Sequence, residues 1–185
     1  NKEVKKPSDF DGMKFRVMTS PMLVEAYKAY GANPTPMPYS EIYSALQLKM
    51  IDGQVQPYFA NQEMKFYEVT KYLISAKQLM FIATVVANQG FYEGLPADIR
   101  KIVDESISGA TDYIFEYEEQ FNEKRKQMML KDKPELVFYE LTDEEKAAFR
   151  EKARQVVDVY LKIGGDGAQE VLDAVKADIG KAQGK

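Results

Sequence analysis

The sequence predicts an α/β fold in which a parallel sheet is built from a β-α-β-α-β unit. Two observations in the first third of the chain indicate this order. Residues 13–18 alternate apolar and polar side chains, as a strand does, and two stretches of helical spacing follow, each bounded by an extended segment. A third observation is the apolar run at 79–87, interrupted only by Thr84, which is typical of a strand buried on both faces.

The first strand and the first helix have clear boundaries in the sequence. Met13, Phe15 and Val17 would share the apolar face of the strand. The loop that follows predicts a helix with Ser20 as its N-cap and Pro21 at its first position. The expected apolar stripe of this helix consists of Leu23, Ala26, Tyr27 and Tyr30, and the helix should stop at Gly31.

Residues 33–38 carry prolines at three alternate positions. Each proline removes a backbone N–H, so we expect an extended edge segment here at most. The helix after it is predicted from Ile42, Ala45 and Leu46, which recur at helical spacing, with Ser40 as the expected N-cap.

An Asp-Gly turn at Asp52 and Gly53 separates this helix from a predicted strand at 54–57, which ends at a proline. Gln54 and Gln56 would lie on the face opposite Val55. Two amides on one face fit a surface that meets a polar ligand. The spacing alone favours ordinary hydrogen-bonded residues near a sheet edge, but it leaves both readings open.

The middle of the chain predicts an unusually long helix. Residues 61–69 should be helical or mixed and 72–74 extended, before the strand at 79–87. Gly94-Leu95-Pro96 then opens a helix whose apolar residues step by three or four from Ile99 to Phe121, more than six turns at about 3.6 residues per turn. One compact lobe does not need a helix of this length, so we expect it to brace two lobes.

The last third of the chain predicts one more strand and two helices. Leu136 to Tyr139 is the strand candidate. Thr142 and Glu145 form a capping-box pattern at the start of the next helix. The pair Gly164-Gly165 should break that helix, and residues 168–179 form a final short one.

The composition is that of a globular protein of one or two domains, with 45% apolar and 29% charged residues in 185. The net charge of −4 argues against a nucleic-acid partner. The basic run from Lys124 follows acidic residues on the same helix and reads as a solvated face. Without histidine or cysteine, the chain has no means for imidazole or thiolate metal sites or for Ser-His-Asp chemistry.

Two further features bear on the compartment. The longest apolar run is strand-sized, well short of the roughly 18 to 20 residues that span a bilayer. The sequence also shows no signal peptide, which fits a cytoplasmic chain, an already processed chain or a fragment.

Arg16 and Tyr39 are the ligand contacts that the residues themselves suggest. Ligands of open parallel sheets bind beyond the carboxyl ends of the strands, and Arg16 lies near such an end. A guanidinium there could hold a carboxylate bidentately. An exposed arginine or an internal salt bridge fits the spacing as well. Tyr39 could supply an aromatic wall beside the ligand or pack in the core.

Catalysis finds little support in the sequence. The acidic clusters at 116–119 and 143–145 fall on helix surfaces and do not resemble a pair of carboxylates set across a cleft. A glycine-rich phosphate loop does not follow any predicted strand. We therefore do not expect an enzyme.

Four runs of residues resemble a known family. They are GMKFRVMTSPM from Gly12, GANPTPMPYSEIYSALQLKMIDGQ from Gly31, KFYEVTKYL from Lys65 and LPADIRKIV from Leu95. Together they resemble the carboxyl-terminal part of DctP-type periplasmic substrate-binding proteins, which serve TRAP (tripartite ATP-independent periplasmic) transporters. The resemblance covers essentially the whole chain, and its most specific marks are the K-x-R-V strand and the helix that leads into Asp-Gly-Gln.

The resemblance implies a fold of two α/β lobes, joined by hinge strands and a long bracing helix, that closes on a small organic acid. It assigns the ligand carboxylate to Arg16 and an aromatic contact to Tyr39. Gln56 stands where the family usually has a ligand-binding asparagine. Met18 and Pro57 complete the expected ligand-binding set. The family resemblance also implies a periplasmic location, TRAP permease subunits as partners and no cofactor.

Two departures from the family pattern carry expectations of their own. Members that hold a metal beside the ligand use an acidic residue where this chain has Val55, so we expect no metal. Full members begin with a further lobe of more than a hundred residues. We therefore expect a fragment in which the strand 79–87 has lost its neighbours and promotes self-association of the chain.

The resulting domain assignment has four parts. Residues 7–78 form the ligand-binding α/β lobe, a periplasmic-binding-protein-like unit, and 79–95 form a crossover strand toward the absent first lobe. Residues 96–130 form the long bracing helix, and 131–185 form a strand and helices that pack on the lobe.

The leading functional hypothesis is a solute-binding protein that delivers a small carboxylate compound to a TRAP-type transporter. A ligand-presenting partner of a membrane sensor is the alternative from a different class, and an enzyme acting on small organic acids is the third. The sequence does not identify the organic acid.

Overall fold

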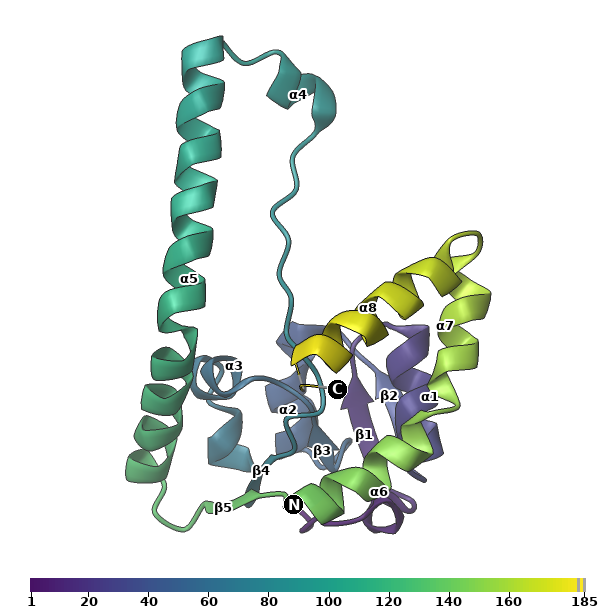
Figure 1. Cartoon of the computed structure of the whole chain (residues 1–185). Helices are drawn as coiled ribbons and strands as arrows, with labels where there is room; N and C mark the ends of the chain where they lie inside the picture. The colour runs from purple at the N-terminus through teal and green to yellow at the C-terminus, as the bar shows by residue number, and fades with distance from the viewer. Residues whose placement is uncertain (183, 185) are drawn as a thin grey trace.

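The computed structural model describes residues 1–182 and 184, and its first sheet has three parallel strands (Figure 1). These strands are β1 (Lys14–Val17), β2 (Asn33–Pro36) and β3 (Gly53–Gln54), in the order β2-β1-β3. Both pairings with β1 are parallel. The predicted β-α-β-α-β unit is therefore confirmed, with β1 at its centre.

The first crossover helix, α1 (Pro21–Ala29), begins as predicted. The Ser20 side chain accepts a hydrogen bond from the backbone N–H of Leu23, and Pro21 occupies the first helical position. Gly31 follows the helix with a φ of 100°, a conformation that side-chain-bearing residues rarely adopt. A Cβ at this position would also lie 2.1 Å from Asp11 Oδ1, so only glycine fits this turn.

The main core lies between β1, α1 and the C-terminal helices and is largely aromatic. Phe15 and Tyr27 stack with their ring centroids 4.5 Å apart, and Phe10 meets both rings edge-on. Phe149, from far along the sequence, packs edge-on against Tyr30. The buried members of this core are Val4, Phe10, Met13, Phe15, Val17, Leu23, Tyr27, Tyr30, Ala32, Leu141 and Phe149.

The second crossover starts differently from the prediction. A short 3₁₀ turn, η2 (Tyr39–Glu41), leads directly into α2 (Ile42–Gln47). Glu41 therefore occupies the N-cap position of α2, and the expected N-cap Ser40 lies inside the turn without a capping hydrogen bond. A preceding 3₁₀ turn already supplies carbonyls at the start of a helix, so the side-chain cap is not needed.

The strand predicted at 54–57 is shorter than expected. Only Gly53 and Gln54 pair with β1, and the chain then leaves the sheet because Pro57 becomes the N-cap of α3 (Tyr58–Glu63). The Asp-Gly turn itself is fixed from both sides. Asp52 exchanges backbone and side-chain hydrogen bonds with Lys14, at 2.7 and 2.8 Å.

A second, two-stranded sheet joins distant parts of the chain. After the 3₁₀ turn η3 (Phe66–Val69), β4 (Tyr72–Ser75) pairs in parallel with β5 (Val137–Glu140). The extended pieces predicted near 72–74 and 136–139 are thus confirmed as strands.

Residues 79–88 run as an extended segment away from the body and do not form the strand predicted at 79–87 (Figure 1). Ile82 is 73% exposed and Val86 85% exposed. The pattern of this segment is that of a buried strand, but the described residues offer it no neighbouring strand to supply hydrogen bonds. The assignment of 79–95 as a crossover toward another lobe stays a prediction.

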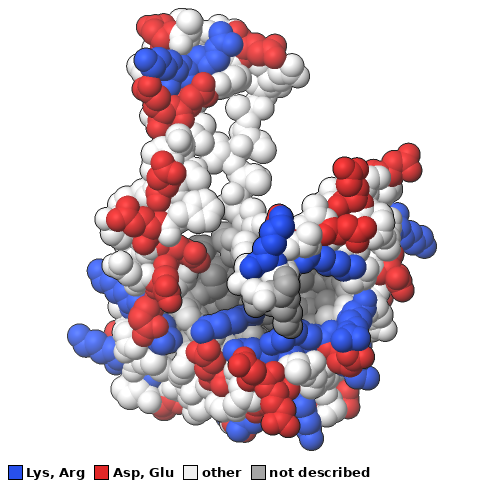
Figure 2. Space-filling view, in the orientation of Figure 1, with Lys and Arg blue, Asp and Glu red and all other residues white. Residues whose placement is uncertain are grey.

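The short helix α4 (Gln89–Glu93) turns the chain back into α5 (Ala97–Asp132), which contains 36 residues. The long helix is therefore confirmed. Figures 1 and 2 show its first half and the segment 79–88 standing clear of the body as a projecting arm. We call residues 79–121 the apolar arm, because large apolar residues of both its segments are exposed.

The last turns of α5 are attached to the body through α3 and η3. Arg125 Nη1 donates to Gln62 Oε1 at 2.6 Å, and its Nη2 donates to Glu63 at 3.2 Å. Just after the helix, Lys133 Nζ donates to the carbonyls of Tyr67, Glu68 and Thr70, at 2.8 to 3.1 Å. These bonds hold the lower end of the helix while its first half stays free.

The C-terminal helices cover the outer side of the first sheet (Figure 1). The capping box of Thr142 and Glu145 opens α6 (Asp143–Ala153) as predicted. The continuation is a separate helix, α7 (Val156–Gly164), and both pack against α1. The final helix, α8 (Ala168–Ala182), follows the glycine pair. None of the described helices combines the length and the apolar character needed to cross a bilayer.

We predict opposite effects for two alanine substitutions at glycine. A Cβ at Gly53 would lie 2.8 Å from Phe15 Cε2 in the core, so Gly53→Ala should lower the free energy of unfolding by about 1–3 kcal/mol through overpacking. Gly109, within α5, has nothing within 4 Å of its would-be Cβ, so Gly109→Ala should raise helix stability by about 1 kcal/mol. Urea unfolding measures both, and equal effects of the two changes would contradict the close packing at Gly53.

Candidate ligand-binding site

Arg16 lies in the central strand β1 and is only 3% exposed. Its Nε and Nη2 both donate to the carbonyl of Met37, at 3.0 and 2.8 Å. This two-point contact fixes the plane of the guanidinium, and it uses two of the five N–H donors. Nη1 is buried and has no hydrogen-bond partner among the described residues.

The described residues place no counterion beside the charge of Arg16. Among the ion pairs of the described residues none includes this guanidinium. Burial lowers the pKa of Arg16 from its ordinary value, and the nearby Tyr39 hydroxyl acts in the opposite direction. The group stays protonated at neutral pH, because an arginine pKa begins so far above it. Of the interpretations that the sequence left open, the structure excludes an exposed arginine, and the described residues form no salt bridge with Arg16.

Tyr39 stands at the start of η2 and is 39% exposed. Its ring meets Phe66 edge-on at 5.8 Å, while the rest of the side chain faces solvent. Partial burial and the charge of Glu63 raise the pKa of the Tyr39 hydroxyl, and Arg16 lowers it. Tyr39 is thus close enough to Arg16 for each group to affect the pKa of the other, and its side chain is exposed enough to contact a ligand.

Gln54 sits beside Arg16, because the parallel pairing places these two residues opposite each other. Gln54 Nε2 donates to Asn61 Oδ1 at 2.6 Å. Asn61 is itself buried, and its Nδ2 donates to the carbonyls of Gln56 and Pro57 at 3.0 Å. Gln54 Oε1 is buried without a partner among the described residues.

The other expected ligand contacts lie around this centre with less defined roles. Gln56 and Pro57 contribute carbonyls that hold Asn61, as described above. Met18 follows β1 and is 46% exposed, and its carbonyl accepts from the N–H of Ser20 at 2.7 Å. The assignment of Gln56, Pro57 and Met18 side chains to a ligand stays a prediction.

Two surface hollows lie elsewhere in the molecule. One of 260 Å³ is lined by residues of α1 and α7, and one of 440 Å³ by residues of α7 and α8. Both are shallow and neither contains Arg16 or Gln54. The candidate site is defined here by its unpaired buried polar atoms, Arg16 Nη1 and Gln54 Oε1.

Comparison with known proteins identifies the family. Residues 1–163 match the model of DctP, described as bacterial extracellular solute-binding protein, family 7. The chain belongs to this family. Family 7 membership confirms the resemblance predicted from the four sequence runs.

Two relatives show how far the likeness extends. The ectoine/5-hydroxyectoine-binding periplasmic protein UehA of Ruegeria pomeroyi is 40% identical over 172 residues, which are 93% of this chain and 51% of UehA. The C4-dicarboxylate-binding periplasmic protein DctP of Rhodobacter capsulatus is 37% identical, over 92% of this chain and 50% of that protein. The chain thus spans about half the length of the curated relatives it matches. Both names agree with the predicted periplasmic location.

The solved structure of the ectoine-binding protein of the TeaABC TRAP transporter, from Halomonas elongata, superposes with a TM-score of 0.91. It is 37% identical, and the match covers 96% of this chain and 57% of that one. A TRAP solute-binding protein from Desulfovibrio salexigens, solved with bound orotic acid, gives 0.88 at 29% identity, over 98% and 58%. The predicted α/β, periplasmic-binding-protein-like fold is confirmed. The division into four domain segments stays a prediction.

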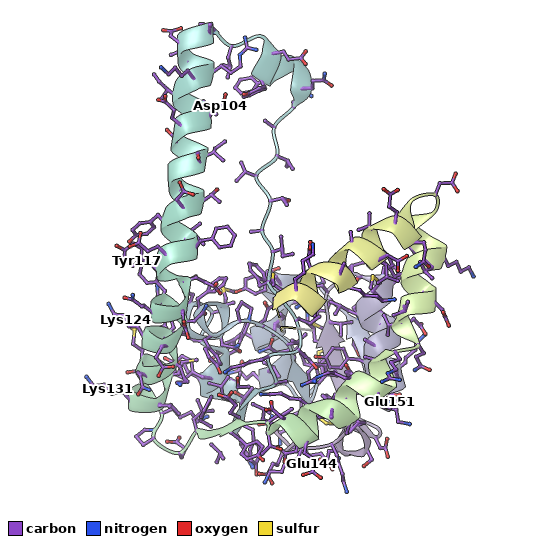
Figure 3. All side chains as sticks on the ribbon, in the orientation of Figure 1. Asp104, Tyr117, Lys124, Lys131, Glu144 and Glu151 are labelled. Carbon is purple, nitrogen blue, oxygen red and sulfur yellow. The ribbon has the colours of Figure 1, made fainter. Side chains whose placement is uncertain are left out.

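Acidic side chains of this family 7 chain do not gather into a metal site. The described residues contain no group of three His, Cys, Asp or Glu side chains that could hold an ion. Figure 3 shows Glu144 and Glu151 on the outer side of α6, and both are exposed. Glu144, from the acidic cluster at 143–145, thus lies on the helix surface as the sequence predicted.

Sequence reasoning missed Asn61 and did not commit to Gln54. The signal for Gln54 was present, because its amide was expected on the face opposite Val55. Asn61 gave no such signal, since its role depends on where α3 begins, and the predicted strand to Pro57 concealed that boundary. The contact with Met37 was also not foreseen, because it joins residues 21 positions apart.

We predict that Asn61→Asp lowers the free energy of unfolding by about 1–3 kcal/mol, because an acceptor would then face the carbonyls of Gln56 and Pro57. The matched control is Asn88→Asp. Asn88 caps α4 by accepting from the N–H of Phe91, and aspartate caps equally well. Urea unfolding of the two variants measures the difference, and an unchanged Asn61→Asp protein would contradict the assigned amide orientation.

Proposed function

We propose that this chain forms the part of an extracytoplasmic solute-binding protein that captures a small carboxylate-bearing compound for a TRAP-type transporter. The single observation that carries the proposal is the buried guanidinium of Arg16, which has a fixed orientation, a free Nη1 and no ion-pair partner among the described residues.

The energetics of burial support an anionic ligand. A buried charge without a partner is strongly unfavourable, and a hydrogen-bond donor left unpaired costs about 1–3 kcal/mol, more when it is charged. A carboxylate that accepts from Nη1 removes both penalties on binding. Charge-assisted bonds of this kind are shorter and about twice as strong as neutral ones.

Relatives support the same chemical class. Two are named for ectoine, three for C4-dicarboxylates and one for 2,3-diketo-L-gulonate, and structures of two others contain orotic acid and succinate. These compounds share a carboxylate and differ in almost everything else. We infer that the carboxylate is the common recognition element and that other residues select among the acids.

The proposal includes the location and the partners of the protein. It would act in the periplasm and deliver its solute to TRAP membrane permease subunits, as the names of its relatives indicate. It would carry out no catalytic step and would not bind nucleic acid. Surface positions of the acidic clusters support the first of these points, and the net charge of −4 the second.

We predict that Arg16→Lys, in the complete gene product, weakens carboxylate binding by about 1.5–3 kcal/mol, since lysine keeps the charge but loses the planar contact with Met37. Titration calorimetry against ectoine, succinate and malate measures this. The control is Arg150→Lys, an exposed arginine on α6, which should bind like the wild type.

The melting temperature of each variant separates a binding effect from misfolding. An Arg16→Lys protein that folds and binds every acid with wild-type affinity would remove Arg16 from the proposed role. Mass spectrometry of ligand carried through purification of the complete gene product would name the natural solute.

We also propose that the 185-residue chain by itself associates with a second copy through the apolar arm. Its exposed large apolar residues are Leu79, Met80, Phe81, Ile82, Val85, Val86, Phe91, Ile99, Ile102, Ile107, Tyr113, Ile114, Phe115 and Phe121. A contiguous apolar surface of this kind is rare on monomeric proteins, and the segment 79–88 offers an unpaired backbone for strand exchange.

Light scattering during gel filtration tests this association. The 185-residue chain should give a mass above its monomer mass of 21.1 kDa, and Ile82→Lys with Val86→Lys should return it toward that value. Gln47→Lys with Gln169→Lys adds the same charge at exposed sites outside the apolar arm and should leave the association intact. A monomeric wild-type chain would refute the proposal.

A further inference from the structure

Arg16 and Gln54 present one unpaired donor and one unpaired acceptor on the same face of the sheet. Residues opposite each other in parallel strands direct their side chains to the same side. Arg16 Nη1 and Gln54 Oε1 are both buried, and neither has a partner among the described residues, so they do not bond to each other. Any group that satisfies both must offer an acceptor to one and a donor to the other.

The orientation of the Gln54 amide follows from the hydrogen-bond network. Asn61 Nδ2 donates to two carbonyls, those of Gln56 and Pro57, which accept only. Asn61 must therefore turn its Oδ1 toward Gln54. The Nε2 of Gln54 donates a hydrogen bond to this oxygen at 2.6 Å. An exchange of N and O in either amide would bring two acceptors or two donors together. Gln54 Oε1 is thereby fixed as an acceptor.

We propose that Gln54 Oε1 accepts a hydrogen bond from a hydroxyl or N–H group next to the carboxylate held by Arg16. This inference rests on the proposed function and narrows its ligand class. The favoured solutes are small acids with a donor on the carbon beside the carboxyl group, such as 2-hydroxy acids or cyclic amino-acid derivatives.

The same geometry disfavours two other kinds of acid. An acid with only hydrogen atoms beside its carboxylate leaves Gln54 Oε1 unpaired in a buried position, which costs binding free energy. A 2-oxo acid should bind more weakly still, because its carbonyl oxygen would face Gln54 Oε1, which is also an acceptor. The expected order of affinity is 2-hydroxy acid, unsubstituted acid, 2-oxo acid. Sites built to bond a polar substrate group discriminate strongly against analogues that lack it.

Titration calorimetry on the complete gene product tests this order with two matched sets. The first set is D- and L-malate against succinate, and the second is D- and L-lactate against propionate and pyruvate. We expect one malate enantiomer to bind about tenfold more tightly than succinate, as one added hydrogen bond of about 1.4 kcal/mol gives. Gln54→Met keeps the length of the side chain but removes the acceptor. It should lower the ratio of malate affinity to succinate affinity to about one.

Two comparisons separate recognition from a structural effect. In Gln54→Met the affinity for malate should fall about tenfold more than the affinity for succinate, whereas distortion of the site would weaken both to the same extent. Gln47→Met, an exposed glutamine at the end of α2, should retain the wild-type ratio. Gln56→Met tests the amide that the family resemblance favours.

The outcomes are distinct. Loss of the malate preference in Gln54→Met alone supports the inference. Equal affinity of the wild type for malate and succinate, a ratio that survives Gln54→Met, or loss of the preference in Gln56→Met alone would overturn it. If no carboxylate of either set binds to the wild type, the carboxylate proposal itself fails, and the inference fails with it.

Discussion

A buried positive charge without a counterion among the described residues is the constraint on which the rest of this structure depends. Arg16 can be buried because β1 is the middle strand of its sheet, with β2 and β3 on either side. The carbonyl of Met37, just past β2, holds two of its nitrogens, and β3 brings the Gln54 amide alongside. Each strand of the small sheet therefore contributes to one polar centre, while its other face builds an aromatic core.

The local sequence was sufficient to predict the ends of several helices, because those ends depend on capping residues that are neighbours along the chain. Ser20 and Pro21 start α1, Gly31 ends it, and the pair Thr142 and Glu145 starts α6, all as predicted. Arg16 could be singled out for a related reason, since alternation places it opposite the apolar face of β1. Ser40 shows the limit of such rules. It has the composition of a cap, but the chain uses a 3₁₀ turn at the same place.

The features that the sequence did not predict depend on contacts between distant segments of the chain. The strand at 79–87 was predicted from its apolar pattern, yet a strand exists only where another strand accepts its hydrogen bonds, and the described residues provide none. The Gln54–Asn61 hydrogen bond could not be predicted either, because it depends on a strand that ends earlier than its sequence pattern suggests. Its chemistry arises because Pro57 ends the sheet early and starts α3, which turns a residue of the next helix back toward β3.

The attachment of α5 has a mechanical consequence. Arg125 binds this helix to α3, and α3 carries Asn61, whose amide sets the direction of Gln54 Oε1. At about 1.5 Å per residue, the 36 residues of α5 extend roughly 54 Å, so a small rotation at the fixed end becomes a large swing at the tip. The fixed end of α5 is therefore connected through α3 to the polar centre around Arg16 and Gln54, so a rearrangement of that centre would be amplified at the distant tip of the helix.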